Sequence, residues 1–391
     1  MQVLLLTTSF PVKEGSSSGI FVERLAQRLG QNCRLRILAP SADSPTKKTN
    51  NKPYELVTFR YAPTKWQILA HGGGGIPATL NAQPWTLVLL PFFLVSMFLS
   101  CLKYARKADI IFANWSICGV IAGIVGGITG RPVVTTLRGE DANRAHSSRI
   151  HRFLISLCLR LNRRVVTVSD DIAMRLSQLF PAFADKIVMI PNGVSFLSLK
   201  DNPHKLIKKD SVNLIMIGSL IPRKSVSTAL NAMSLLPQEF SLTILGDGPE
   251  MGNLRSLVNN LLLNQRVRFA GHIQPEQIPL WFADADVLVM TSKSEGRPNA
   301  VLEALAAGVP VVGSDIPGLR ELLLPNVNGV LFPLEDHKAL ASSLLPLADR
   351  ELRIRLGEGG QKFIAERNLT WENTAARYMS EFRQFCSKEN P

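Results

Sequence analysis

The chain has 391 residues, of which 46% are hydrophobic and 19% charged, and a formal net charge of +13 at pH 7. This length accommodates two domains of roughly 100–200 residues each, and the apolar content excludes an intrinsically disordered protein. The five cysteines are scattered and form no CxxC pair. The sequence therefore favours a globular protein of a reducing compartment over one held by disulfides or a structural zinc ion.

Short apolar runs rich in Val and Ile alternate with amphipathic stretches in the first half of the chain. Continuous apolar runs bounded by turn residues are typical of parallel strands that are covered on both faces. We therefore predict a Rossmann-like N-terminal domain at residues 1–192. Its predicted strands are VLLLTT (3–8), RLRILA (34–39), DIIFAN (109–114), PVVTTL (132–137), RVVTVS (164–169) and KIVMIP (186–191).

No charged residue occurs between Lys65 and Lys103, and residues 84–102 form an apolar run long enough to cross a bilayer. The run is either a buried helix, a surface that dips into lipid, or a spanning helix. A spanning helix is topologically implausible because it would separate the first strands from the rest of their sheet. Residues 144–164 add a basic amphipathic helix, which fits an anionic surface or a solvated face.

All of the excess positive charge lies in the first half of the chain. Residues 1–190 contain 23 Lys and Arg against 10 Asp and Glu, whereas residues 191–391 contain 21 of each kind. Such a basic half attracts anionic membranes or phosphate groups, or serves solubility alone. No nucleic-acid-binding signature is present, so nucleic acid is not an expected partner. We expect a cytoplasmic protein that binds peripherally to the inner face of the cytoplasmic membrane.

A polar stretch at 193–212 predicts a linker, after which the alternation restarts in a second Rossmann-like domain at 213–370. The predicted fold is α/β, with two such domains facing each other across a deep cleft, where the carboxyl ends of the strands bind ligands. Residues 349–385 look helical throughout, and 371–391 are expected to cross back to the N-terminal domain. The predicted strands are NLIMIG (213–218), SLTILG (241–246), RVRFAG (266–271), ADVLVM (285–290) and VPVVGS (309–314).

Two carboxylates, Glu295 and Glu303, lie eight positions apart in SEGRPNAVLEALAAGVPVVGSD (294–315). Glu295 follows a predicted strand, and Glu303 lies about one turn into a helix that begins near Asn299. The N–H groups at a helix N-terminus suit an anion, and carboxylates suit sugar hydroxyls. A nucleoside diphosphate sugar offers both an anionic diphosphate and sugar hydroxyls. Two glutamates at this spacing without such surroundings would be interpreted as solvated surface charges.

This stretch resembles the Glu-x7-Glu motif of retaining GT-B glycosyltransferases, especially family four (glycosyl transferases group 1). The resemblance covers nearly the whole chain and includes PNGV (191–194), GSLIPRK (218–224), GDGP (246–249) and AGHI (270–273). It implies transfer of a hexose from a UDP- or GDP-sugar to a lipid-linked or polysaccharide acceptor in envelope or exopolysaccharide synthesis. A nucleotide-sugar epimerase or hydrolase, or a non-catalytic sugar-nucleotide-binding protein, are the alternatives on this fold.

The resemblance implies that Glu303 binds the ribose of the donor and that Glu295 holds a hydroxyl of the transferred sugar. Arg223 and Lys224 would clamp the diphosphate, whose negative charge grows as the glycosidic bond breaks. Neither a metal ion nor a cofactor is then expected, and Glu295, Arg223 and Lys224 form the catalytic group. The other donor-binding candidates of this half are Gly218, Gly246, Asp247, His272, Ile273, Gly296, Pro298, Asn299, Ala300 and Val301.

In the first half, the loop before the first predicted helix resembles the family's glycine-containing loop. Gly19 would let the backbone approach the donor phosphate or the acceptor, and Asn192 is a further donor-binding candidate. Arg138 of TLRGED (136–141) stands where many relatives have a histidine that contacts the transferred sugar. An arginine cannot act as a general base, so we expect Arg138 to bind donor or acceptor, while Asp141 orients it or contacts the acceptor.

The family usually has glycine after the cationic pair, whereas this chain has Ser225, which makes the loop less permissive but suits a helix N-cap. No catalytic base is assigned. Retention of configuration is expected from front-face displacement, in which an oxygen of the donor phosphate takes the acceptor proton.

Overall fold

A computed structural model of the chain describes residues 1–12, 18–43, 51–71, 75–139, 145, 148–195 and 211–386. The chain divides into two compact units. Unit 1 comprises Met1–Asn192 together with Trp371–Pro391, and unit 2 comprises Gly193–Thr370. Most of the expected linker, 193–212, lies outside the described residues.

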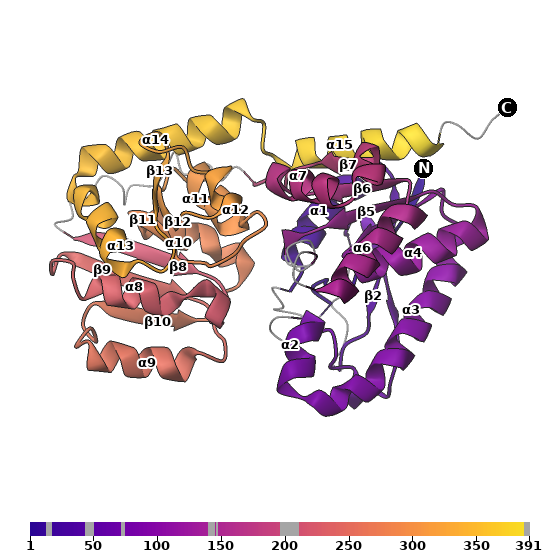
Figure 1. Ribbon diagram of the computed structural model, residues 1–391, viewed down its shortest axis with the longest axis horizontal. Helices are drawn as coiled ribbons and strands as arrows, with labels where there is room; N and C mark the ends of the chain where they lie inside the picture. The colour runs from indigo at the N-terminus through magenta and orange to yellow at the C-terminus, as the bar shows by residue number, and fades with distance from the viewer. Residues whose placement is uncertain are drawn as a thin grey trace. The chain divides into compact units, whose positions relative to one another are not determined.

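Unit 1 contains a seven-stranded parallel sheet with the order β3-β2-β1-β4-β5-β6-β7 (Figure 1). The prediction missed β3, because this edge strand is interrupted by the exposed Glu55 and has no continuous apolar run. The strands are β1 (Gln2–Leu6), β2 (Arg34–Pro40), β3 (Tyr54–Phe59), β4 (Ile110–Asn114), β5 (Val133–Leu137), β6 (Arg164–Thr167) and β7 (Ile187–Met189).

Helices cover both faces of this sheet. On one face, α1 (Ile20–Gly30) and α15 (Trp371–Cys386) share a buried core with the strands, to which α15 contributes Trp371, Tyr378 and Phe382. On the other face, α3 (Leu90–Ala105), α4 (Ser116–Thr129) and α6 (Arg149–Leu161) pack side by side. Further helical segments in the described part of unit 1 are η1 (Thr64–Trp66), α2 (Gly75–Ala82), η2 (Pro84–Leu89), α7 (Asp170–Leu179) and η3 (Pro181–Lys186).

The apolar run 84–102 folds into η2 and most of α3. One side of α3 packs on the sheet through Phe93, Met97, Cys101 and Ala105, which have no exposed surface. The other side is exposed. Among the described residues, Pro84–Ala105 is the one helical segment long and apolar enough to span a membrane, with a mean hydropathy of 2.2 and 28% of its apolar window buried.

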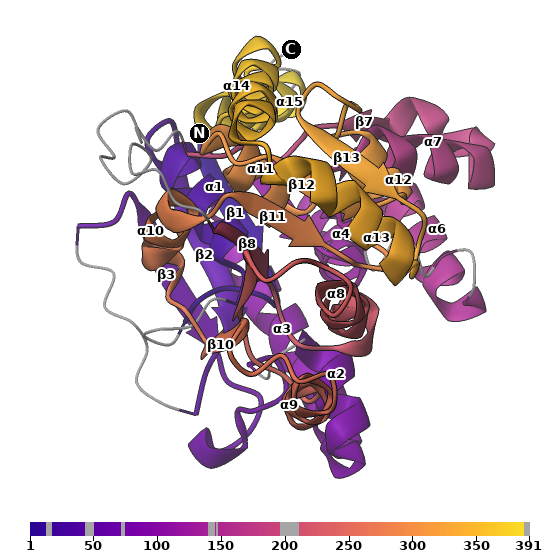
Figure 2. The same ribbon diagram turned by 90° about the vertical axis from the view of Figure 1, so that its left-hand side faces the viewer.

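Unit 2 contains a six-stranded parallel sheet with the order β10-β9-β8-β11-β12-β13 (Figure 2). Both sheets therefore have the Rossmann-like α/β arrangement that the sequence predicts. The prediction missed the short edge strand β13, which begins with glycine. The strands are β8 (Val212–Ile217), β9 (Phe240–Leu245), β10 (Val267–Gly271), β11 (Val287–Met290), β12 (Val311–Ser314) and β13 (Gly329–Phe332).

The second sheet is also covered on both faces. Helices α8 (Val226–Met233), α9 (Met251–Asn260) and α13 (His337–Leu344) pack on one face. Helices α10 (Ile278–Asp284), α11 (Asn299–Ala306), α12 (Pro317–Arg320) and α14 (Arg350–Glu366) pack on the other. Within the described part of the unit, three short 3-10 segments are also present, namely η6 (Pro222–Lys224), η7 (Pro275–Gln277) and η8 (Leu345–Ala348).

The prediction of continuous helix over 349–385 is wrong. Helix α14 ends at Glu366, and α15 begins at Trp371. Asn368 between them has a positive φ of 46°, a conformation that asparagine tolerates and that commonly ends helices. The Val194 N–H donates to the Leu369 carbonyl at 2.9 Å. The residues between the two helices are thus bonded within unit 2, and the chain enters unit 1 at Trp371.

Candidate functional site

The predicted residues of unit 2 lie at a topological switch point of its sheet. Strands β8 and β11 are neighbours, and the chain leaves them toward opposite edges of the sheet. The carboxyl ends of such a strand pair are where open parallel sheets bind ligands. The loops that follow β8 and β11 are joined, because the Lys293 N–H donates to the Arg223 carbonyl and the Thr291 hydroxyl donates to the Lys224 carbonyl, each at 2.8 Å.

These two loops bring Glu295 to both members of the predicted cationic pair. Lys224 Nζ lies 2.5 Å from Glu295 Oε1, and Arg223 Nη1 lies 3.5 Å from Glu295 Oε2. Arg223 Nη1 also donates to the Ser294 carbonyl at 2.7 Å. The three side chains assigned to the catalytic group are thus in direct contact, although 71 positions separate Lys224 from Glu295.

The electrostatics of this cluster favour an ionised carboxylate. Burial by itself raises the pKa of Glu295, but the charges of Lys224 and Arg223 and hydrogen bonds from Lys224 and Ser292 outweigh it and hold the pKa below its usual value. Two cations therefore face one carboxylate at neutral pH. The remaining positive charge suits a ligand that carries phosphate.

Glycine backbone lies directly beside this cluster. Gly218 and Gly246 both have positive φ, 151° and 146°, which other residues rarely adopt. A Cβ atom on Gly246 would lie only 1.9 Å from the Gly218 carbonyl oxygen, and one on Gly218 would lie 3.2 Å from Lys224 Cε. The loops after β8 and β9 therefore approach each other in a way that only glycine permits. Asp247, which follows, is exposed and accepts a hydrogen bond from the Gly248 N–H.

The other predicted residues of unit 2 follow strands at the same edge of the sheet. Pro298 is the N-cap of α11, so the backbone N–H groups of the first helical turn, Asn299 to Val301, come directly after the Glu295 loop. Glu303 is the fifth residue of α11 and is partly buried. His272 and Ile273 follow the edge strand β10; His272 is exposed, whereas Ile273 packs against the core.

In unit 1, Arg138 lies buried at the carboxyl end of β5. Its guanidinium donates to Asn114 Oδ1 at 3.1 Å and to Asn192 Oδ1 at 2.9 Å, and it lies 4.2 Å from the centre of the Phe21 ring. The structure thus joins two of the predicted residues, Arg138 and Asn192. Sequence reasoning missed Asn114 and Phe21, although the polar end of DIIFAN was a signal for the former.

Two more backbone positions near this cluster are constrained. Gly19 has a φ of 73°, and a Cβ there would lie 2.3 Å from the Ser9 carbonyl oxygen, so glycine is required. Trp115, which follows Asn114, has a φ of 79°, a strained conformation for a bulky residue. Asp141 lies outside the described residues.

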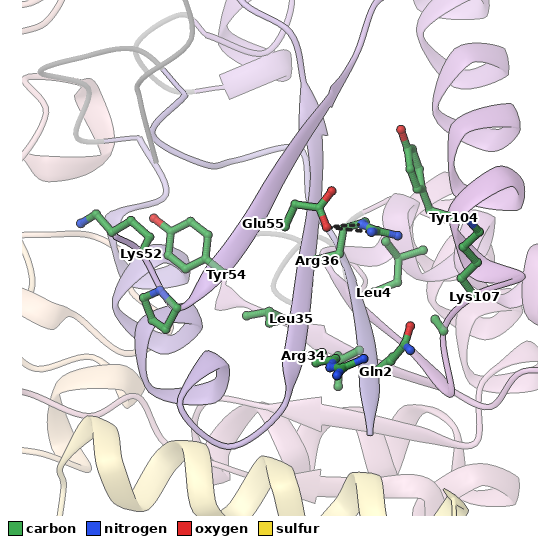
Figure 3. A pocket seen from close by; sticks show the side chains of 13 residues that line it. Gln2, Leu4, Arg34, Leu35, Arg36, Lys52, Tyr54, Glu55, Tyr104 and Lys107 are labelled. Carbon is green, nitrogen blue, oxygen red and sulfur yellow. Dashed lines mark hydrogen bonds and ion pairs between the residues drawn. The ribbon is translucent and has the colours of Figure 1, made fainter. Parts of the chain in front are cut away.

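No cluster of three or more potential metal ligands occurs among the residues that the structure describes. A hollow of about 540 Å³ lies at the amino ends of β1, β2 and β3 (Figure 3). Gly19 and Arg138 follow the carboxyl ends of β1 and β5, at the opposite edge of the sheet. Arg36 pairs with Glu55 in the hollow at 2.7 Å. The hollow contains none of the predicted site residues.

Two sequence families match the chain. Glycosyl transferases group 1 matches residues 199–363, and Glycosyltransferase Family 4 matches residues 18–196. The chain belongs to the GT-B glycosyltransferases of group 1. This confirms the prediction of a GT-B glycosyltransferase of group 1.

Curated relatives of this glycosyltransferase are found in envelope glycan synthesis. A lipopolysaccharide core biosynthesis glycosyltransferase of Rhizobium meliloti (strain 1021) is 31% identical over 51% of this chain and 58% of its own length. A UDP-Gal:alpha-D-GlcNAc-diphosphoundecaprenol alpha-1,3-galactosyltransferase of Escherichia coli is 27% identical over 62% of this chain and 67% of its own. The chain thus spans less than two thirds of the length of the first relative.

Solved structures share the fold over the full length of this glycosyltransferase. The Anabaena protein Alr3699/HepE, crystallised in complex with UDP, superposes with a TM-score of 0.77 and 19% sequence identity, covering 98% of this chain and 100% of that one. At this identity the similarity concerns the fold. It agrees with the two Rossmann-like sheets described above.

Proposed function

We propose that this protein is a retaining glycosyltransferase that moves a hexose from a nucleotide-sugar to a lipid-linked or polysaccharide acceptor in envelope or exopolysaccharide synthesis. The observation that carries the proposal is the contact of Arg223 and Lys224 with Glu295, beside the N-terminus of α11. Cations, a carboxylate and the N–H groups of a helix N-terminus in one place match the diphosphate and the hydroxyls of such a donor.

The side chains of the cluster have separate tasks in this proposal. Arg223 and Lys224 bind the diphosphate and stabilise the charge that develops on it as the bond to the sugar breaks. Glu295 holds both cations in place while the site is empty and takes a hydroxyl of the sugar when the donor binds. Glu303 binds the ribose. Because the two cations supply the positive charge, the reaction is proposed to need no metal ion.

We propose a uridine diphosphate sugar as the donor, with a guanosine diphosphate sugar as the alternative. Support comes from HepE, which binds UDP, and from the Escherichia coli relative, whose name gives UDP-Gal as donor. The same name gives a diphosphoundecaprenol-linked acceptor. A lipid-linked acceptor places the reaction at a membrane, and we propose peripheral binding at the inner face of the cytoplasmic membrane.

The donor site is tested by thermal shift with UDP, GDP, ADP and their sugars. A ligand of the native state raises the melting temperature in proportion to its affinity and concentration. We expect UDP and a UDP-sugar to raise it, and Lys224→Ala to remove most of this effect. Lys362→Ala is the matched control, because Lys362 is exposed on α14 and pairs only with Glu366 among the described residues.

Turnover is measured on the same variants once a donor is found. Lys224→Ala and Arg223→Ala should each lower kcat by on the order of 100-fold, because a cation aimed at developing charge contributes about 3 kcal/mol. Unchanged turnover in both would refute the site. Release of free sugar without an acceptor requirement would favour the alternative of a nucleotide-sugar hydrolase.

A further inference from the structure

The outer side of η2 and α3 in unit 1 is apolar and exposed. Leu87, Val88, Phe92, Val95 and Leu99 point away from the sheet, and each is 57–62% exposed. We call these five residues the α3 face. The opposite side of the same helix is buried in the core of unit 1. The apolar residues of this segment therefore lie on two sides of the helix. Packing on the sheet explains those of the buried side, but it does not explain the α3 face.

Neighbouring elements extend this apolar surface. Helix α4 packs beside α3 (Figure 1). It contains no charged residue and exposes Ile124 and Ile128. Trp66 at the end of η1 and Trp85 near the start of η2 are both half exposed, with ring centres 6.3 Å apart. Soluble proteins rarely leave so much apolar surface uncovered on adjacent helices, so a partner is expected to cover it.

Positive charge borders the apolar surface. Residues 56–169 contain 13 Lys and Arg but only three Asp and Glu. Lys103 and Arg106 are exposed at the C-terminal end of α3, and Arg149 and Arg152 are exposed on α6, which packs against α4. In Figure 3, Lys107 lies beside Tyr104 at the same end of α3. A second copy of the chain would bring the same positive border and would be repelled.

We propose that the α3 face docks on the surface of a bilayer that contains anionic lipids. The apolar side chains enter the boundary between headgroups and acyl chains, Trp66 and Trp85 lie at headgroup depth, and the bordering Lys and Arg contact lipid phosphates. The helix lies in the interface and does not span the bilayer, because its other side packs on the sheet through Phe93 and Met97.

The purpose of this docking rests on the proposed function, since it brings the enzyme to a lipid-linked acceptor. The docking itself involves no residue of the donor site. Lipid binding and donor binding are therefore measured separately on each protein, and failure of one leaves the result of the other intact.

The full chain is floated with vesicles of phosphatidylcholine alone and with vesicles in which an equal share of phosphatidylglycerol is added. We expect binding to the mixed vesicles that weakens as salt is raised. Phe92→Ser combined with Val95→Ser should lower the partition constant for the mixed vesicles by on the order of tenfold or more. The reason is that two apolar side chains are no longer transferred from water into the lipid.

The matched control is Leu262→Ser combined with Leu280→Ser. These two leucines of unit 2 are 86% and 72% exposed, more than any residue of the α3 face, so hydrophobicity alone would make them equally important. We expect wild-type flotation for the control. Each variant must also keep the wild-type melting temperature and its shift with UDP, which separates loss of docking from misfolding.

The charged border is tested by Arg149→Glu combined with Arg152→Glu, with Arg355→Glu on the exposed side of α14 as the matched control. The α6 pair should lower binding to mixed vesicles at low salt, and the control should not. The proposal is overturned if the wild type fails to float at low salt, or if the α3-face variant floats like the wild type. It is also overturned if that variant turns a dimer into a monomer by light scattering, since the face would then bind a second copy.

Discussion

Units 1 and 2 have the same strand order around their switch points but differ in what their surfaces carry. Unit 1 contains 26 Lys and Arg against 13 Asp and Glu, whereas unit 2 contains 18 of each kind. The outer helices of unit 2 are ordinary, since α14 exposes Glu351, Arg355 and Glu358 to water. In unit 1, α3 exposes Phe92, Val95 and Leu99 instead.

This difference teaches that one fold serves two kinds of contact. A parallel sheet requires only that the inner sides of its helices be apolar. The outer sides and the loops at the carboxyl ends are free to vary. In unit 2 the loops contain the cation–carboxylate cluster, and in unit 1 the outer helix surface carries the apolar face and its positive border.

The largest expected effect is a loss of stability in unit 2 that leaves the stability of unit 1 unchanged. Gly246→Ala places a Cβ 1.9 Å from the Gly218 carbonyl at a φ that alanine rarely adopts, and should destabilise unit 2 by about 3 kcal/mol. Hydrogen exchange should accelerate in peptides of 212–370 but not of 75–139. Gly252→Ala in α9 is the control, because nothing lies within 4 Å of its Cβ and the helix should gain about 0.5–1 kcal/mol.

The next largest effect is a loss of stability in unit 1, from a change at the carboxyl ends of its strands. Arg138→Met removes the donor that Asn114 and Asn192 share and should lower the free energy of unfolding of unit 1 by about 2 kcal/mol. Urea unfolding followed by tryptophan fluorescence suits this test, because four of the five tryptophans belong to unit 1. Arg163→Met, at an exposed arginine, should change stability little; an equal loss in both would mean that the hydrogen bonds of Arg138 contribute nothing.

A pH series sharpens the comparison in the acid range. The folded pKa of Glu295 is depressed by Lys224 and Arg223, so its ionised form stabilises unit 2 above the unfolded pKa, and this contribution is lost as the pH falls through the folded value. Melting temperatures of the wild type and of Glu295→Gln should therefore differ at neutral pH and converge in acid. A difference that stays constant would contradict the assigned ion pairs.

The smallest effect is expected at Ser225. This residue has a φ of 47° at the N-cap of α8 and makes no side-chain cap; among the described residues its hydroxyl bonds only the Thr228 hydroxyl, at 3.1 Å. Ser225→Gly relieves the strain at the cost of that bond and should stabilise unit 2 by about 0.5 kcal/mol. Ser225→Ala keeps the strain and loses the bond, so it should be less stable than the wild type; the reverse order would show that the strain is negligible.

Most of the fold could be predicted because buried parallel strands are continuous apolar runs, as in DIIFAN and ADVLVM. The strands that escaped are β3 and β13, which lie at sheet edges and lack such a run. The break at Asn368 also escaped, because the amphipathic pattern continues through it. Asn368 itself was a local signal for a helix end. The hydrogen bond from Val194 to Leu369 that accompanies this end joins distant parts of the chain, and the sequence pattern does not reveal it.

The candidate site divides in the same way. The sequence by itself determined which residues to consider, since Glu295, Glu303 and the pair Arg223–Lys224 stand in motifs at strand ends. Only the tertiary structure decided that Glu295 pairs with both cations, that Arg138 is held by two asparagines, and that one side of α3 is left uncovered. The physical reason is that hydrophobic periodicity specifies local conformation, whereas contacts between distant segments arise only when whole elements pack.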